Sequence, residues 1–192
     1  MADAHPLLQI VTASTRQGRQ GPSVAAWFVQ QARQHAQFAI EPIDLAEMNL
    51  PLIDEPSHPR LRRYQHEHTK QWSACVERAD AFVFVTPEYN FSAPPSLVNG
   101  IDYLFHEWAY KPVGFVSYGG VSGGLRSVQM LKQTVTALKM VPMVEAVSIP
   151  FFTKSIDASG TFTPDDLQNK AAAAMLTELR RWTNALQTLR TK

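Results

Sequence analysis

Residues 79–90, with the sequence ADAFVFVTPEYN, join a short apolar run to a polar loop. The run from Ala79 to Val85 is bounded by turn residues, and its composition is typical of a strand that is buried on both faces. A simple turn after such a strand needs only a few small residues. This loop instead presents a carboxylate, a phenol and an amide, and further prolines follow it. Its composition therefore suggests a binding surface.

Size and composition indicate one domain that spans residues 1–192. The chain has 45% hydrophobic residues, 18% charged residues and a formal net charge of +1. These values give no electrostatic reason to expect nucleic acid or a membrane surface as a partner, and no stretch approaches the ~20 apolar residues of a membrane span. The N-terminus lacks the basic region of a signal peptide, and the single cysteine can form no internal disulfide. We therefore expect a cytoplasmic protein.

The hydrophobic pattern predicts strands that alternate with helices. Strand-like runs cover residues 7–12, 38–45, 81–86, 112–118 and 141–148. Helical spacing follows Pro22, Leu61, Pro95, Leu125 and Thr163, and a proline-rich surface loop covers residues 48–60. In the last helix, the residues predicted to point inward are Leu167, Ala171, Met175, Leu179, Trp182, Leu186 and Leu189.

This alternation is typical of an α/β protein with a doubly wound, five-stranded parallel sheet and helices on both faces. Two arrangements are open for five strands: a Rossmann-like order, and a flavodoxin-like order of 2-1-3-4-5. Ligands bind such sheets beyond the carboxyl ends of the strands, where the winding reverses. In the flavodoxin-like order, this point lies between the first and third strands. The loops over residues 13–23 and 86–95 are therefore the expected site.

The loop after the first strand has the composition of a phosphate site. Ser14 and Ser23 offer hydroxyl groups. Arg16 and Arg19 offer guanidinium groups, and Gly21 stands where the next helix begins. Free N–H groups at a helix N-terminus attract phosphate, and arginine adds bidentate hydrogen bonds. The alternative is an ordinary capped helix behind a solvated basic loop, and the pattern of a triphosphatase phosphate loop is absent.

The polar loop after the third strand suits a flat cofactor. It holds Pro87, Glu88, Tyr89 and Asn90, which combine successive backbone donors with an aromatic ring. A heteroaromatic cofactor could lie there with its polar edge on the backbone N–H groups. The alternative is a rigid polar loop without a ligand.

The loop after the fourth strand is rich in glycine and leads into a helix. It begins with Ser117, Tyr118, Gly119 and Gly120, and its glycines let a flat or anionic group approach the backbone closely. One alternative is a flexible turn, and another is a dinucleotide site, since Glu145 follows at a suitable distance. The dinucleotide fingerprint, however, belongs after the first strand.

Three blocks of the sequence together resemble the NADPH-dependent FMN reductase family, which comprises flavodoxin-like quinone, azo and related reductases. The blocks are STRQGRQGPSVAAWF, ADAFVFVTPEYNFSAPPSLVNGIDYL and KPVGFVSYGGVSGGLRSVQML. The similarity runs from about Leu7 to about Val147. Two positions depart from the family pattern, because Ala13 stands in place of a common glycine and Val98 in place of a common lysine.

The resemblance implies which residues hold the cofactor. The FMN phosphate is expected at Ser14, Arg16 and Ser23. The isoalloxazine ring is expected against residues 87–90, with the pair Gly119–Gly120 closing the site.

The resemblance also implies an enzyme that passes a hydride from NADPH through bound FMN to a quinone-like, azo or flavin acceptor by a ping-pong mechanism. No catalytic side chain is then expected, because FMN carries the chemistry. One alternative is a flavodoxin-type electron carrier without a nicotinamide site, although such carriers are typically acidic. Another is an NAD-binding Rossmann enzyme. The choice between NADPH and NADH stays open.

A homodimer or homotetramer is the expected assembly, with each flavin site bordered by the partner chain. Tyr103 is the predicted interface residue, because it points away from the apolar stripe of its helix and aromatic residues are enriched at interfaces. No metal site is predicted, since His66 and His68 should point apart on a helix. Cys75 is predicted to be a buried core thiol.

Overall fold

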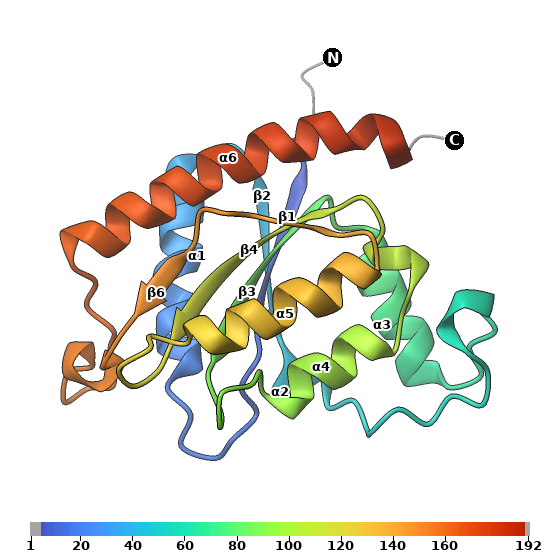
Figure 1. Ribbon diagram of the computed structural model, residues 1–192, viewed down its shortest axis with the longest axis horizontal. Helices are drawn as coiled ribbons and strands as arrows, with labels where there is room; N and C mark the ends of the chain where they lie inside the picture. Colours follow the sequence, from blue (N-terminus) through green and yellow to red (C-terminus); the bar gives the residue numbers. More distant parts are fainter. Residues whose placement is uncertain (1–4, 191–192) are drawn as a thin grey trace.

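The computed structural model describes residues 5–190, which form a parallel sheet with helices on both faces (Figure 1). The strands are β1 (Leu7–Thr12), β2 (Ala39–Asp44), β3 (Ala81–Pro87), β4 (Pro112–Tyr118), β5 (Val141–Pro142) and β6 (Val147–Ile149). The α-helices are α1 (Gly21–His35), α2 (Leu45–Met48), α3 (Glu67–Glu77), α4 (Pro95–Asp102), α5 (Leu125–Ala137) and α6 (Asp166–Arg190). Short 3-10 helices cover Pro59–Leu61, His106–Trp108 and Phe152–Ser155.

The strand order is β2-β1-β3-β4-β5, and every pairing is parallel. The flavodoxin-like prediction is therefore confirmed, and the Rossmann-like order is wrong for this chain. Thr12 at the end of β1 pairs with Val85 near the end of β3. The loops after these two strands consequently leave the sheet at the same edge.

The fifth position in the sheet differs from the single strand that the sequence predicts over residues 141–148. Two short strands, β5 and β6, both pair with β4 at this position. Residues 143–146 between them belong to neither strand, and Val144 is 84% exposed. The apolar run in the sequence thus overstates the length of continuous pairing, because Val144 turns to solvent.

Strand β3 separates two hydrophobic layers. Ala81, Val83 and Val85 face the layer that contains α1 and α6. Phe82 and Phe84 face the layer that contains α3, α4 and α5. In Figure 1, α6 runs along one side of the strands, and α4 and α5 lie on the other. All of β3 is buried, as its apolar run predicted.

The helix predicted from Leu61 begins later in the structure. It starts at Glu67, because Leu61 ends a 3-10 turn that Arg62 closes with a left-handed φ of 50°. The proline-rich loop therefore extends further along the chain than its prolines indicated.

The predicted inward face of the last helix is correct only in part. Leu167, Trp182 and Leu189 are 75%, 43% and 57% exposed. The residues of α6 that are buried are Gln168, Ala172, Met175, Leu176, Leu179, Thr183 and Leu186. A helix of 25 residues is about 37 Å long, whereas the seven residues of β4 span about 23 Å. Helix α6 is therefore longer than the strand that it packs against, and this strand cannot cover its whole length.

Candidate active site

Three loops meet at the carboxyl edge of the sheet and line a cavity of about 380 Å³. They follow β1, β3 and β4, and a segment after β6 completes the wall. The predicted cofactor-binding residues that line the cavity are Ser14, Arg16, Arg19, Pro87, Glu88, Tyr89, Tyr118, Gly119 and Gly120. Residues from three distant parts of the sequence thus face one hollow.

Two of the predicted residues, Ser23 and Ser117, use their hydroxyl groups outside the cavity. The Ser117 hydroxyl donates to the carbonyl of Gly123 over 2.8 Å. The Ser23 hydroxyl oxygen accepts a hydrogen bond from the backbone N–H of Phe162 over 2.6 Å. Both serines therefore brace the surrounding loops.

Gly21 lies behind the cavity and makes room for Tyr118. A Cβ atom at Gly21 would lie 2.5 Å from the Tyr118 hydroxyl oxygen. The Tyr118 ring packs against Phe152, with 4.9 Å between ring centroids. Burial raises the pKa of Tyr118 well above its usual value. Tyr118 therefore keeps its proton at neutral pH and offers the cavity an uncharged hydroxyl group.

The loop after β1 presents a row of free backbone donors. The N–H groups of residues 14–18 have no hydrogen-bond acceptor within residues 5–190. The Ser14 hydroxyl lies 2.7 Å from the Tyr89 hydroxyl, and Arg16 is exposed at the cavity. Helix α1 follows with no side-chain cap. Free N–H groups, a helix N-terminus and an open arginine fit a phosphate group such as that of FMN.

Arg19 has a different environment from Arg16. Its guanidinium group donates to both carboxylate oxygens of Asp44, over 2.5 and 2.7 Å, and to the Ser14 carbonyl over 2.6 Å. The hydrogen bond to Asp44 raises the pKa of Arg19. Arg19 thus ties the loop to the end of β2, and Arg16 is the arginine of this loop that is open to a ligand.

The chain makes a tight turn at residues 89–92. Tyr89 and Ser92 exchange two backbone hydrogen bonds of 2.9 Å each. Between them, Asn90 and Phe91 have φ values of 50° and 69°. A positive φ is rare for a large side chain and tends to occur at functional sites. Asn90 stands at the tip of this turn beside the cavity wall.

The turn leaves fewer backbone N–H groups free to bind a ligand than the sequence suggested. The Tyr89 N–H donates to the Ser92 carbonyl, and the Glu88 N–H donates to the Tyr118 carbonyl over 3.2 Å. Among the N–H groups from Glu88 to Asn90, only that of Asn90 has no acceptor in the part of the chain that the structure describes. A flat ligand at this loop can therefore use one of these donors.

The glycines after β4 approach the segment after β6. The Gly119 N–H donates to the Ile149 carbonyl over 3.3 Å, and the Gly120 carbonyl accepts from the Phe151 N–H over 3.0 Å. A Cβ atom at Gly120 would meet no atom within 4 Å. Gly120 therefore borders open space.

Four residues of the wall were not predicted from the sequence, namely Gln20, Phe151, Phe152 and Thr153. The last three residues follow β6. A signal was available, because the carboxyl end of a parallel fifth strand reaches the same edge as those of its neighbours.

A sequence model of the family described as NADPH-dependent FMN reductase matches residues 7–154. The chain belongs to this family. It is an oxidoreductase that uses FMN and NAD(P)H, as the three sequence blocks predicted.

Similar proteins include FMN and quinone reductases. An NAD(P)H-dependent FMN reductase from Schizosaccharomyces pombe is 39% identical over 149 residues, which cover 76% of this chain and 74% of the relative. An NAD(P)H:quinone oxidoreductase from Solanum tuberosum is 32% identical over 111 residues, covering 53% of this chain and 55% of the relative. The flavoenzyme FerB of Paracoccus denitrificans, an NAD(P)H:(acceptor) oxidoreductase, has the same fold. Its TM-score is 0.72 at 21% identity, with 94% of this chain and 98% of that chain covered.

These findings decide between the alternatives. Membership of this reductase family is inconsistent with the alternative that the protein is an electron carrier without a nicotinamide site. The strand order β2-β1-β3-β4-β5 is inconsistent with the alternative that the protein is an NAD-binding Rossmann enzyme.

Both departures from the family pattern contact the apolar core of this FMN reductase. Ala13 is fully buried, so its Cβ packs inside the protein. Val98 is partly buried and packs against the same core layer.

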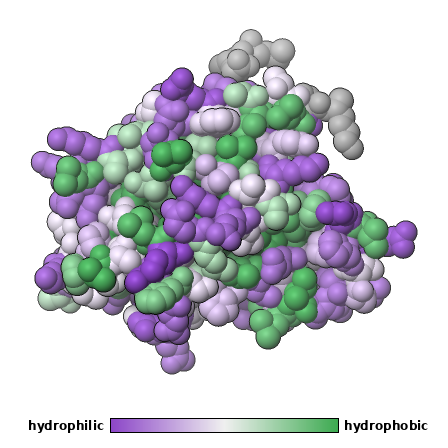
Figure 2. Space-filling view, viewed as in Figure 1, coloured by the Kyte–Doolittle hydropathy of each residue, from purple (hydrophilic) through white to green (hydrophobic). Residues whose placement is uncertain are grey.

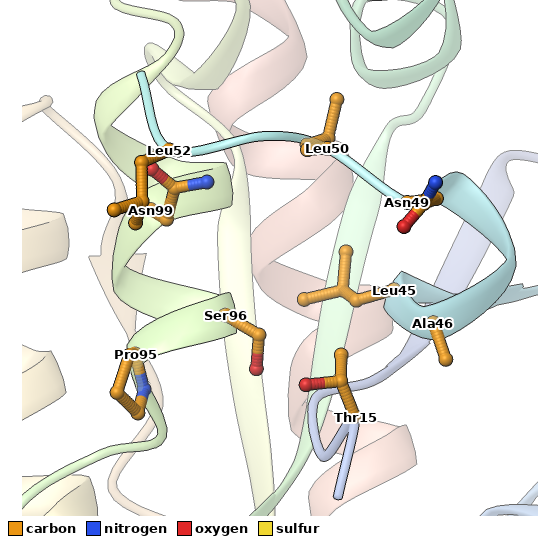
Figure 3. Close-up of a pocket in the computed structure, with 9 residues that line it drawn as sticks. All are labelled: Thr15, Leu45, Ala46, Asn49, Leu50, Leu52, Pro95, Ser96 and Asn99. Atoms are coloured by element: carbon orange, nitrogen blue, oxygen red, sulfur yellow. The ribbon is translucent and has the colours of Figure 1, made fainter.

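A second cavity of about 430 Å³ adjoins the loop after β1 (Figure 3). The hydroxyl groups of Thr15 and Ser96 face each other across it. The Asn99 amide holds its rim, because Oδ1 accepts from the Ile53 N–H over 2.9 Å and Nδ2 donates to the Pro51 carbonyl over 2.7 Å. Since Thr15 follows Ser14 in the chain, both cavities share this loop.

His66 and His68 lie together, although the sequence predicted that they point apart. Their rings stack with 5.3 Å between centroids, because His66 precedes α3 instead of lying within it. Both rings contact Asp54. Within residues 5–190, no group of three or more His, Cys, Asp or Glu side chains could hold a metal ion.

Cys75 is buried, as predicted, and burial raises the pKa of its thiol. None of the helices formed by residues 5–190 is both long enough and apolar enough to cross a membrane.

Proposed function

We propose that residues 1–192 form one FMN-binding domain that passes a hydride from NADPH through bound FMN to a quinone-like, azo or flavin acceptor. The observation that carries this proposal is the 380 Å³ cavity, which is lined by Ser14 and Arg16 of the loop with free N–H groups and by Gly119 and Gly120. The quinone oxidoreductase and FMN reductase names of the relatives support the acceptor class. The single buried Cys75 supports a reducing, cytoplasmic compartment.

The chain supplies binding and orientation, and FMN, when bound, supplies the redox chemistry. Arg16 and the N–H groups of residues 14–18 would hold the phosphate. The loop from Pro87 to Asn90 and the pair Gly119–Gly120 would hold the ring system. The Asn90 N–H is the donor available to stabilise negative charge on the polar edge of the ring.

Two titratable side chains in the wall have fixed protonation states near neutral pH. Burial keeps the Tyr118 hydroxyl protonated. For Glu88, burial acts to raise the pKa, but the hydrogen bonds from Arg126 and Ser122 outweigh it and lower the pKa. Neither side chain is therefore expected to exchange a proton with a ligand near neutral pH.

Initial-rate measurements with NADPH and a soluble quinone should show ping-pong kinetics. We expect parallel double-reciprocal lines, because one cavity must receive the two flat ligands in turn. Intersecting lines, together with evidence of a ternary complex, would mean that the second cavity beside Thr15 holds one of the ligands, and the single-site mechanism would then be wrong.

We also propose that the protein is a homodimer or homotetramer whose partner chain lies next to the FMN site. Tyr103 is not the interface residue, because it is fully buried and its hydroxyl donates to Pro51 and Asp54. Tyr103 is the C-cap residue of α4, and its side chain packs into the same hydrophobic layer as Leu97 and Ile101. Leu52 and Ile53 are the better candidates, since they are 80% and 45% exposed.

Figure 2 shows an apolar patch over the loop that follows α2. We therefore expect that sedimentation at micromolar concentration gives a mass of at least twice 21.5 kDa. Leu52→Asp should shift the protein towards the monomer, because a carboxylate would be buried at the interface. Leu167→Asp is the matched control, since Leu167 is 75% exposed on α6 and should leave the mass unchanged. A monomeric wild-type protein with full activity would refute the proposed assembly.

A further inference from the structure

The carboxylate of Glu88 is held by four donors. Its Oε1 atom lies 2.5 Å from both Nε and Nη2 of Arg126. Its Oε2 atom accepts from the Ser122 hydroxyl over 2.8 Å and from the Arg126 backbone N–H over 3.1 Å. The Glu88 side chain is only 6% exposed. The cavity wall thus contains a nearly buried carboxylate, and its ion pair with the partly exposed Arg126 connects the loop after β3 to α5.

The surroundings of Arg126 fix its guanidinium group in this position. Its Cζ atom lies 3.8 Å from the centre of the Phe91 ring, so the group stacks on the strained turn. Helix α5 has Gly124 at its N-cap and no side-chain cap of its own. Glu88 therefore caps α5 from a different loop, at the positive end of the helix dipole.

The charge of this carboxylate matters for the proposed cofactor. Reduced FMN loses a ring proton near neutral pH and then carries a negative charge on its ring that oxidised FMN lacks. An uncompensated carboxylate in the cavity wall would repel this charge, and the repulsion is strongest where water is excluded. The Arg126 side chain and the N-terminus of α5 both compensate the charge of Glu88.

We infer that Arg126 is a positioning residue of the FMN site that also balances its charge: by pairing with Glu88, it holds the loop after β3 in place and lets the cavity accept reduced FMN as well as oxidised FMN. This inference rests on the proposed function, because it requires FMN in the 380 Å³ cavity.

The test compares the Kd values of oxidised and reduced FMN, measured by anaerobic titration of the FMN-free full chain. Arg126→Gln should raise the Kd of reduced FMN about tenfold or more relative to that of oxidised FMN, as expected when a charge loses its close partner. Glu88→Gln combined with Arg126→Gln should restore the wild-type ratio, because no carboxylate then remains. Arg126→Lys keeps the charge and should stay close to the wild-type ratio.

Arg62→Gln is the matched control. The Arg62 side chain is 45% exposed, like that of Arg126, and it forms an ion pair with Glu77 at a distance of 2.8 Å. Arg62 does not line the 380 Å³ cavity. It should change neither Kd.

Equal weakening of both FMN forms by Arg126→Gln, with no restoration in the double variant, would show that Arg126 only braces the loop and would overturn the inference about charge. An unchanged Kd ratio in a variant that still binds FMN and turns over NADPH would overturn this inference alone. A wild-type chain that binds neither form of FMN would overturn the proposed function together with it.

Discussion

Replacing Gly124 with alanine should lower the free energy of unfolding by about 2–5 kcal/mol, as the sum of a left-handed backbone penalty and an overpacking penalty. Gly124 has a φ of 86° at the start of α5. A Cβ atom there would lie 2.8 Å from Cβ of Ser117 and 2.9 Å from the backbone nitrogen of Tyr118. These atoms belong to strand β4, which is paired on both sides in the sheet, and they cannot move aside. Urea unfolding of the FMN-free protein measures the loss.

Gly120→Ala is the control for this substitution. Gly120 lies in the same loop, but a Cβ atom there would meet nothing within 4 Å, so its stability should change by less than about 0.5 kcal/mol. Equal stabilities of the Gly124→Ala and Gly120→Ala proteins would mean that the loop after β4 adjusts freely and is not held by the strand.

Replacing Arg16 with alanine should weaken FMN binding by roughly ten- to a hundredfold, because a charge-assisted hydrogen bond contributes ~1.5–3 kcal/mol. The fold should be unchanged, since Arg16 is exposed and forms no ion pair within residues 5–190. Fluorescence titration of the FMN-free protein measures the Kd.

Riboflavin lacks the phosphate group of FMN, so it separates the contribution of the phosphate to binding from that of the ring. The wild-type protein should prefer FMN to riboflavin, and Arg16→Ala should leave riboflavin binding unchanged. Arg63→Ala, which alters another exposed arginine outside the cavity wall, should affect neither ligand. A higher KM for NADPH with an unchanged Kd for FMN would instead assign Arg16 to the 2′-phosphate of NADPH.

The fold could be predicted from the sequence because its central strand has no polar face. The residues from Ala81 to Val85 are all apolar, and both faces of β3 are covered by helices. The break in the fifth strand could not be predicted, since the exposure of Val144 depends on how the segment meets β4. The local hydrophobic pattern therefore identified the buried strand β3, but it did not predict how the last segment of the sheet pairs with β4.

The position of the site could be predicted from the topology, but not which of its polar groups are free to bind a ligand. Arg16 and Arg19 look equivalent in the sequence, and they differ because Asp44, at the end of β2, binds only Arg19. Likewise, the Glu88 N–H is used by the carbonyl of Tyr118, which lies in another strand. Such long-range contacts determine which groups are free for a ligand.

The break between β5 and β6 bears on how the protein behaves in concentrated solution. A long, flat edge strand exposes a row of unpaired N–H and C=O groups that can recruit another chain and start aggregation. Here one edge is divided by residues 143–146, and Pro142 lacks an N–H. The opposite edge, β2, contains Pro42, which likewise cannot donate. Both margins of the sheet thus resist strand-to-strand association, which limits aggregation through the sheet edges.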